Sequence, residues 1–167
     1  MTDLSIPPAD LATPLGRAMA FVWHEAELLD RKDYAAWGAL WSADGHYVVP
    51  IERDSEDFAS QLNYVYDDAR MRQLRIERLT SGYSMSAADA AVTVRTVSRF
   101  TLVGSEGDEV EVRSAQILAA YKRGATTLFA GDLTHRIRFT ADGAQLTQKV
   151  VRLVNSQDAL NALGFLL

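Results

Sequence analysis

The stretch that decides the fold covers residues 90–155 and reads AAVTVRTVSRFTLVGSEGDEVEVRSAQILAAYKRGATTLFAGDLTHRIRFTADGAQLTQKVVRLVN. Long runs rich in Val, Thr and aromatic residues alternate in it with short Gly-containing segments. That pattern is typical of β-hairpins that follow one another along the chain. It predicts four long antiparallel strands, at residues 90–103, 110–122, 127–139 and 146–155.

Each predicted strand is longer than the average strand of about five or six residues. Long strands twist, so a sheet built from them curls and acquires a hollow face. Other parts of the chain must fill that face, and the first half of the chain is the candidate.

The first half begins with a predicted helix. Thr13 can cap its N-terminus with a hydroxyl, and Pro14 suits the first helical position. Apolar residues then recur at helical spacing through residues 15–30. They form one stripe only, so we expect that stripe to face the core.

A second, shorter helix is predicted after Asp33, which can cap it. Residues 46–49 then form a short strand, which Pro50 stops. The inward face of the short helix is assigned to Tyr34, Trp37, Leu40 and Trp41.

The polar, acidic residues 51–63 are interpreted as a loop. Asp67 and Asp68 come next, and capping of a third helix, which runs through Leu79, is favoured for them over metal ligation. Helices that precede a run of antiparallel strands indicate an α+β fold with the helices on one face of the sheet.

The two ends of the chain differ in composition. Residues 1–14 contain three of the four prolines, and we expect an N-terminal arm there, followed by a single domain at residues 15–167. The other end carries large apolar side chains that would be costly to leave in water. We therefore expect docking, on the core or on another subunit, for Leu160, Leu163, Phe165, Leu166 and Leu167.

The composition excludes several kinds of partner and site. The chain has 167 residues, 48% of them hydrophobic, and a net charge of −5. An acidic chain is poorly suited to nucleic acid or to an anionic membrane, because phosphate binding needs a basic surface. The chain has no Cys, which excludes disulfides, Cys nucleophiles and thiolate-bound metal sites within it. No signal peptide or membrane span is visible, so we expect a cytoplasmic protein.

A mononuclear iron site needs two His and a carboxylate that converge. The chain has only His24, His46 and His135. No two of them fall at ligand spacing on one predicted element, so we predict neither a metal site nor a cofactor-binding site in this chain.

Acid–base catalysis in the hollow of the sheet would need ionisable groups that are kept from water. The candidates are Asp30, Tyr47, Asp132 and His135. Asp132 and His135 are three residues apart on one predicted strand, so their side chains point to opposite faces. Asp30 is more simply explained as a helix-end residue that pairs with its neighbours in the sequence.

Charged side chains follow one face of two predicted strands. Arg95 and Arg99 share a face of the first strand, and Glu111 and Arg113 share a face of the second. Such stripes are either the solvated side of a sheet or a subunit interface, since Arg suits polar contacts between proteins. The interface interpretation predicts that replacing Arg95 and Arg99 with Ala loosens assembly more than it lowers stability.

The order of several motifs resembles that of a known family. Residues 21–50 read FVWHEAELLDRKDYAAWGALWSADGHYVVP, in which LLD is followed by a Tyr–Trp helix and a Tyr-x-x-Pro strand. Further motifs follow in order: YDD at 66–68, LRIERL at 74–79, VEVRS at 110–114, LFAG at 128–131, KVVRLVN at 149–155 and LGFLL at 163–167. Together they resemble the small, or β, subunit of aromatic ring-hydroxylating dioxygenases, which are Rieske non-haem iron oxygenases.

This resemblance covers nearly the whole chain after the first dozen residues. It implies a cone, in which a strongly curved, mostly antiparallel sheet wraps N-terminal helices; this is the cystatin/nuclear-transport-factor-2-like fold that scytalone dehydratase shares. It implies a large α subunit as partner, commonly in a hexamer of three α and three β chains that contains a β trimer. The Rieske iron–sulfur cluster and the mononuclear iron are expected in the α subunit.

The residues agree with a structural role, because a Rieske centre needs two Cys and two His and this chain has no Cys. The leading hypothesis is a non-catalytic subunit of an oxidoreductase complex for aromatic-compound catabolism. One alternative is a stand-alone cone-fold dehydratase or isomerase with Asp30, Tyr47 and His135 as catalytic residues. The other is a small-ligand-binding protein. A pocket lined by converging ionisable groups would favour the first alternative, and an apolar, water-filled pocket the second.

Overall fold

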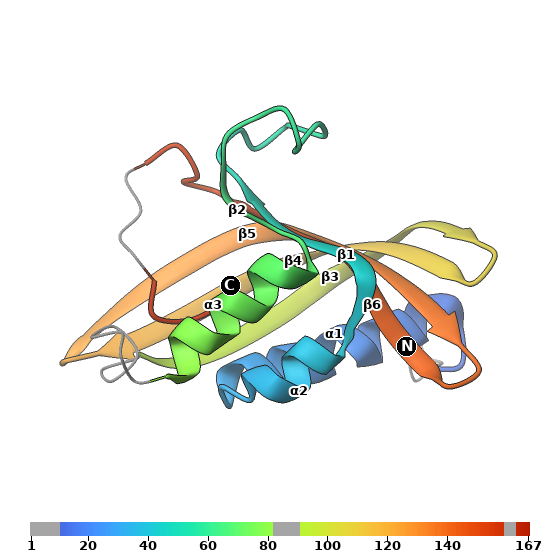
Figure 1. Ribbon diagram of the computed structural model, residues 1–167, viewed down its shortest axis with the longest axis horizontal. Helices are drawn as coiled ribbons and strands as arrows, with labels where there is room; N and C mark the ends of the chain where they lie inside the picture. Colours follow the sequence, from blue (N-terminus) through green and yellow to red (C-terminus); the bar gives the residue numbers. More distant parts are fainter. Residues whose placement is uncertain (1–10, 82–90, 159–162) are drawn as a thin grey trace, which may run out of the picture.

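The computed structural model describes residues 11–81, 91–158 and 163–167 of the chain (Figure 1). Three helices lie on one face of a curved sheet: α1 (Pro14–Asp30), α2 (Tyr34–Ala39) and α3 (Ala69–Thr80). The sheet has six strands, which are β1 (Trp41–Pro50), β2 (Asn63–Asp67), β3 (Val92–Glu106), β4 (Glu109–Lys122), β5 (Ala125–Thr140) and β6 (Gly143–Leu153).

The strand order across the sheet is β2-β1-β6-β5-β4-β3. β1 runs parallel to β6, and every other neighbouring pair is antiparallel. The long strands bend around the helices, which lie in the hollow of the sheet (Figure 1). The arrangement confirms the predicted α+β cone.

The four long strands of the sequence prediction are confirmed as β3, β4, β5 and β6. Each predicted boundary lies within three residues of the observed one, as for 90–103 against Val92–Glu106. Gly107 and Gly124 sit in two of the hairpin turns with φ of +58° and +82°. Only Gly adopts this left-handed conformation without a steric cost, which explains why the turns carry it.

The three helices begin where their caps were predicted. The Thr13 hydroxyl accepts from Gly16 N at 3.0 Å, and the Asp33 carboxylate accepts from Ala36 N at 3.1 Å. At α3 only Asp68 acts as the cap, because its carboxylate accepts from Met71 N at 2.8 Å. Capping by Asp67 is therefore wrong; this residue is 1% exposed and pairs with Arg75 on α3, with an N–O distance of 2.5 Å.

The first strand is longer than predicted. The predicted strand at 46–49 extends to Trp41–Pro50, so Trp41 belongs to β1 and not to the preceding helix. Pairing with β6 explains the difference, since Trp41 lies opposite Leu146 in that ladder. The short strand β2 was missed because its ladder with β1, far along the chain, is what makes it a strand. The loop before it was predicted correctly.

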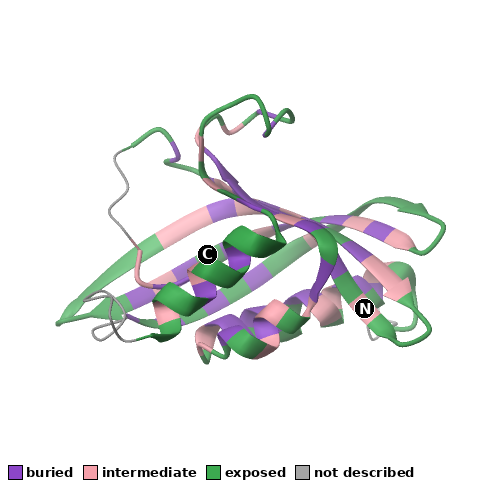
Figure 2. Cartoon of the chain, viewed as in Figure 1, coloured by how far each residue is buried: buried purple, intermediate pink, exposed green. Residues whose placement is uncertain are grey.

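The core lies between the helices and the hollow face of the sheet, and Figure 2 shows buried residues along the facing sides of both. Trp37 on α2 makes edge contacts with Trp41 and Tyr47 on β1, with ring centroids 5.4 and 5.7 Å apart. Aromatic pairs at such distances add about 0.5–1.5 kcal/mol beyond the buried area.

The apolar C-terminal segment docks on the core of its own chain. Phe165, Leu166 and Leu167 are all buried in the main hydrophobic cluster, and Leu163 packs against it. Burial of each large apolar side chain stabilises the fold by about 1.5–3 kcal/mol. Leu160 and residues 1–10, where the arm was predicted, lie outside the described residues. Among the residues that are described, no helix combines the length and apolar character needed to cross a bilayer.

Candidate functional site

The interior of the cone contains a buried cluster of charged side chains. Glu25 on α1 accepts hydrogen bonds from Lys149 Nζ at 2.8 Å and from Trp37 Nε1 at 2.9 Å. The second oxygen of Glu25 lies 3.1 Å from His135 Nε2. The exposed fractions are 1% for Glu25, 0% for His135 and 1% for Lys149. A carboxylate is tolerated at such depth only when it is paired and hydrogen-bonded, and here both of its oxygens are occupied.

Strand register assembles this interior cluster. Lys149 on β6 lies opposite His135 on β5 and opposite Tyr47 on β1. Side chains alternate along a strand, so one row across the sheet turns these three side chains toward the helices. Glu25 follows Val22 by three residues, and both are buried on the same side of α1.

The environment sets the charges in the interior cluster. Burial by itself would raise the pKa of Glu25, but the Lys149 ammonium and the contact with His135 outweigh it and hold this pKa below its ordinary value. Burial lowers the pKa of His135 more than the neighbouring carboxylate raises it. Burial also lowers the pKa of Lys149, and the Glu25 carboxylate opposes this effect. The contacts favour a carboxylate–ammonium pair with a neutral imidazole, which donates through Nε2.

Tyr47 joins the interior cluster to the C-terminal segment. Its hydroxyl accepts from Leu167 N at 3.1 Å and lies 3.3 Å from Leu167 O, to which it donates. Lys149 Nζ donates to the same oxygen at 2.9 Å. Burial raises the pKa of Tyr47 above its usual value, so this phenol stays protonated and serves as a structural hydrogen-bonding group.

Asp30 and Arg95 form a second link between α1 and the sheet. The Asp30 carboxylate accepts from Thr93 Oγ1 at 2.9 Å and from Arg95 N at 2.8 Å, and it also pairs with the Arg95 guanidinium. Arg95 donates in addition to the carbonyl oxygen of Leu166. The expectation that Asp30 pairs with its sequence neighbours is wrong, because its partners lie on β3.

The predicted stripe of Arg95 and Arg99 is also wrong. The register of β3 against β4 shifts between Ser98 and Thr101, and Arg99 has a φ of +54°. This bulge turns Arg99 to the outer face, where its side chain is 70% exposed, whereas the Arg95 side chain is 1% exposed. A β-bulge shifts side chains between faces in this way, and nothing in the local sequence marks it.

Asp30, Tyr47 and His135 line none of the three cavities formed by the part of the chain that the structure describes. Asp30, Tyr47 and His135 all lie on the helix side of the sheet, and each is held by protein groups. The described cavities, of about 720, 410 and 530 Å³, are lined by other residues. Asp132 points to the outer face, opposite to His135, as the spacing of the two predicted. The geometry therefore does not favour a stand-alone acid–base enzyme.

The described histidines are dispersed. His24 is exposed on α1, and His46 on β1 stacks on Tyr66 with ring centroids 5.4 Å apart. Within residues 11–81, 91–158 and 163–167, no three His, Asp or Glu gather in a way that could hold a metal ion. A Rieske cluster needs two Cys, and the chain has none. The residues of this chain therefore do not fit such a cluster.

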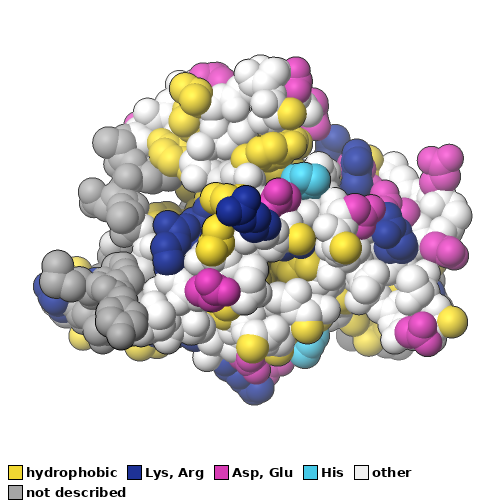
Figure 3. Space-filling model, in the orientation of Figure 1, with side chains coloured by type: hydrophobic (Ala, Val, Ile, Leu, Met, Phe, Trp, Pro, Cys, Tyr) yellow, Lys and Arg dark blue, Asp and Glu magenta, His cyan; other side chains and the backbone are white. Residues whose placement is uncertain are grey.

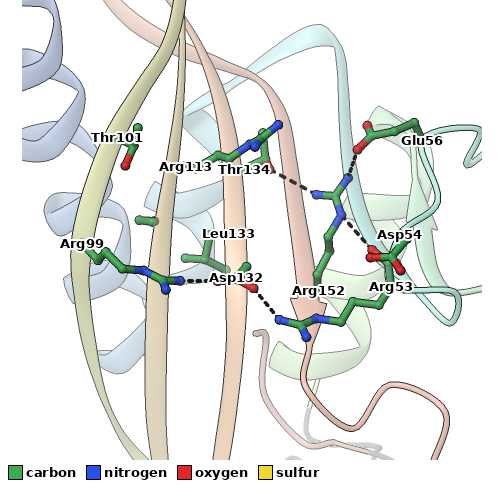
Figure 4. A pocket seen from close by; sticks show the side chains of 11 residues that line it. Arg53, Asp54, Glu56, Arg99, Thr101, Arg113, Asp132, Leu133, Thr134 and Arg152 are labelled. Atoms are coloured by element: carbon green, nitrogen blue, oxygen red, sulfur yellow. Dashed lines mark hydrogen bonds and ion pairs between the residues drawn. The ribbon is translucent and has the colours of Figure 1, made fainter.

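The outer face of the sheet carries a polar cavity of about 720 Å³, which we call the arginine basin after Arg53, Arg99, Arg113 and Arg152 (Figure 4). Asp132 lies between two of them, with one oxygen paired to Arg53 and the other to Arg99. The guanidinium groups come from the loop after β1 and from β3, β4 and β6, so folding alone brings them together.

The remaining two arginines of the basin differ from one another. Arg152 donates to Glu56 at 2.9 Å and to Thr134 Oγ1 at 3.1 Å, and its Nε donates to the carbonyl of Arg53 at 3.1 Å. Arg113 is exposed and makes no ion pair or side-chain hydrogen bond with any described residue. The Arg113 guanidinium is therefore available to bind another molecule.

Sequence reasoning identified only part of these two sites. It named Arg99, Arg113 and Asp132, and it missed Glu25 and Lys149. The signal for Glu25 was a charge on the apolar stripe of a helix. For Lys149 the signal was its position two and four residues before Val151 and Leu153, which places all three side chains on the same face of a predicted strand. The other members missed were Arg53, Glu56, Arg152 and Trp37.

Known proteins with similar sequences indicate the family of this chain. A family model described as "Ring hydroxylating beta subunit" matches residues 24–158. The benzene 1,2-dioxygenase subunit beta of Pseudomonas putida is 30% identical over 171 residues, which cover 95% of this chain and 91% of that relative.

Several solved structures have a fold similar to that of this chain. The beta subunit of the benzoate 1,2-dioxygenase from Burkholderia mallei has a TM-score of 0.76 at 22% identity, over 91% of this chain and 97% of that one. An NTF2-like protein with a cystatin-like fold from Novosphingobium aromaticivorans has a TM-score of 0.57 at 18% identity, over 81% and 79%. The family model spans most of the chain, and these folds agree with it. The chain therefore belongs to the family of ring-hydroxylating β subunits, the small subunits of aromatic ring-hydroxylating dioxygenases.

Proposed function

We propose that this chain is a structural subunit, which assembles with an iron-bearing α subunit and stabilises it without carrying out the reaction itself. The observation that carries this proposal is the state of the cone interior. Glu25, His135, Lys149 and Tyr47 bind one another and the C-terminal segment, and all are at most 1% exposed. Ionisable groups that are buried and paired in this way hold a fold together, although His135 Nδ1 has no hydrogen-bond partner among the described residues.

The redox chemistry belongs to the partner in this proposal. The α subunit supplies the Rieske cluster and the mononuclear iron, and the assembled oxygenase acts on an aromatic compound. A hexamer of three α and three β chains with a β trimer is the proposed assembly, in the cytoplasm. The absence of Cys from this chain supports the division of roles, because a Rieske cluster is held by two Cys and two His.

An exposed apolar surface supports docking of a large partner. Tyr64 and Tyr66 on β2 and Met71 and Leu74 on α3 are 37–42% exposed. Figure 3 shows apolar side chains gathered over α3 and β2. Contiguous exposed apolar side chains often mark interaction sites. β2 is also an edge strand, and edge strands present unpaired main-chain groups.

Co-expression tests the proposed function. We would tag this chain, co-express it with its candidate large subunit, purify through the tag, and record the native mass, iron content and visible spectrum. The expected result is a brown complex of both chains with Rieske absorbance, whereas this chain expressed alone binds no iron. A colourless preparation that never retains the large chain would contradict the proposal.

A matched variant sharpens this experiment. His135→Gln preserves a hydrogen-bond donor toward Glu25 but removes the imidazole, which is a candidate acid–base group of the interior cluster. A structural subunit with this substitution still supports full turnover by the purified complex. Loss of turnover in a complex of unchanged mass and iron content would show that the chain takes part in catalysis.

A further inference from the structure

The arginine basin has an excess of positive charge. Its lining contains four Arg against the three carboxylates of Asp54, Glu56 and Asp132, an excess of one charge. Asp132 and Glu56 are engaged by the other three arginines, and Arg113 has no partner among the described residues. An exposed guanidinium between two hydroxyl-bearing strands is well placed to bind a carboxylate in a forked geometry.

The β3–β4 hairpin carries two acidic side chains that form no ion pair with any described residue. Glu106 and Asp108 flank Gly107 in this turn, are both exposed, and form no ion pair with any described residue. We call these two residues the acidic turn. Figure 1 shows this hairpin, in yellow, projecting beyond the helices. By contrast, Glu109 and Glu111, on β4 beside it, pair with Arg138 and Arg136.

The two features of one chain cannot neutralise each other. Arg113 lies opposite Thr101 in the β3–β4 ladder, and Glu106 is five residues farther along β3. At about 3.3 Å per residue this separation is roughly 17 Å. An unmatched cation and an unmatched acidic pair therefore stand apart on the same surface.

We propose that the acidic turn of one copy docks in the arginine basin of a second copy, where Arg113 pairs with Glu106 or Asp108. The inference rests on the proposed function, in which several β chains share one assembly. It specifies how they meet. Two different patches that fit one another form a heterologous contact, and such contacts close into rings when the rotation allows it. A ring of β chains is the assembly expected here.

Charge reversal tests the contact in the full chain and in the co-expressed complex. The variants are Arg113→Glu, the double change Glu106→Lys with Asp108→Lys, and all three changes together in one chain. Native mass and sedimentation equilibrium measure association between β chains. Arg70 is exposed on α3 and has no partner among the described residues, so Arg70→Glu is the control for the change in net charge. This control is measured on the chain expressed alone, because α3 belongs to the surface proposed to dock the large subunit.

Each reversed side alone is expected to raise the dissociation constant between β chains at least tenfold. The three changes together exchange the charges across every contact in the ring, so they are expected to restore most of the association. Arg70→Glu leaves it unchanged, and far-ultraviolet circular dichroism and the urea midpoint stay those of the parent chain. Salt weakens the parent contact, as it does any contact between exposed charges.

Three results would overturn the inference. Unchanged association in both reversed variants would show that the contact does not exist. Loss of the α subunit from Arg113→Glu, with β–β association intact, would assign the basin to the α subunit instead. Failure of the triple change to restore association would show that the two patches do not face each other. In each case a brown complex from the parent chain leaves the proposed function standing.

Discussion

The interior cluster and the arginine basin use the same kinds of side chain and have opposite roles. Inside the cone, Glu25, Lys149 and His135 are at most 1% exposed, and every charge has a fixed partner. On the outer face, the Arg53, Arg99 and Asp132 side chains are 42–70% exposed, and Arg113 has no partner among the described residues. The first arrangement stabilises a chain, and the second leaves binding capacity for another molecule.

The difference lies in the surrounding dielectric. A charge removed from water is costly, so a buried pair is stable only as a complete unit. Exposed ion pairs are screened by water and contribute little to folding. Removing one member of the interior cluster should therefore damage the fold, and removing one member of the basin should affect association and leave the fold intact.

The largest effect is expected for Lys149→Met. The substitution leaves the Glu25 carboxylate buried without its cation, and breaking a buried pair costs about 3–5 kcal/mol. Urea unfolding followed by circular dichroism measures the free energy of unfolding. Glu25→Gln in the same chain removes the unpaired charge, so the double variant should recover part of the loss. A single variant as stable as the parent would show that the interior pair is not required.

The second-largest loss of stability is expected for Arg95→Ala. This substitution distinguishes the role of Arg95 from that of Arg99. Arg95 is buried against Asp30 and the Leu166 carbonyl, and its loss should cost about 2–3 kcal/mol because Asp30 is 21% exposed and partly solvated. The unfolding free energy from urea titration measures the effect. An unaltered unfolding midpoint together with weakened assembly would restore the interface interpretation of this residue.

The loss of fold stability at acid pH should depend on the protonation of His135. Its pKa in the folded state lies below the ordinary 6.5, so the unfolded chain binds more protons below about pH 6.5. Stability therefore falls as the pH drops from that value toward the folded-state pKa, by at most about 1.4 kcal/mol per pH unit. In His135→Gln the free energy of unfolding should no longer decrease over this pH range. Only the decrease below about pH 4.5, which comes from Glu25, should remain. A parallel pH profile in the variant would contradict the assignment.

The smallest effect on folding is expected for Arg99→Ala. The Arg99 side chain is 70% exposed and pairs with a half-exposed Asp132, so the free energy of unfolding should change by about 0.5 kcal/mol or less. The matched comparison is Arg95→Ala on the same strand, measured in the same titration. Equal losses for the two variants would show that the bulge does not separate their faces.

Local patterns were enough for much of the fold. The caps of α1 and α2 at Thr13 and Asp33 were read from single residues, and the long strands from runs of β-branched side chains between Gly turns. These features act over a few residues, which is why the sequence shows them. β2 and the first half of β1 depend on ladders with distant strands, and no local pattern announces a ladder.

By itself the sequence determined the α+β cone, the docking of the apolar C-terminal segment and, through the order of its motifs, the family. It also determined that this chain holds no Rieske cluster, because no residue can replace an absent Cys ligand. Only the tertiary structure decided which charges are buried and which are open to a partner. Glu25 meets Lys149 across 124 residues, and a bulge at Arg99 reverses the face that alternation predicts. Register and bulges arise from packing over the whole sheet, so the roles of individual charges follow from the fold and not from their neighbours in the chain.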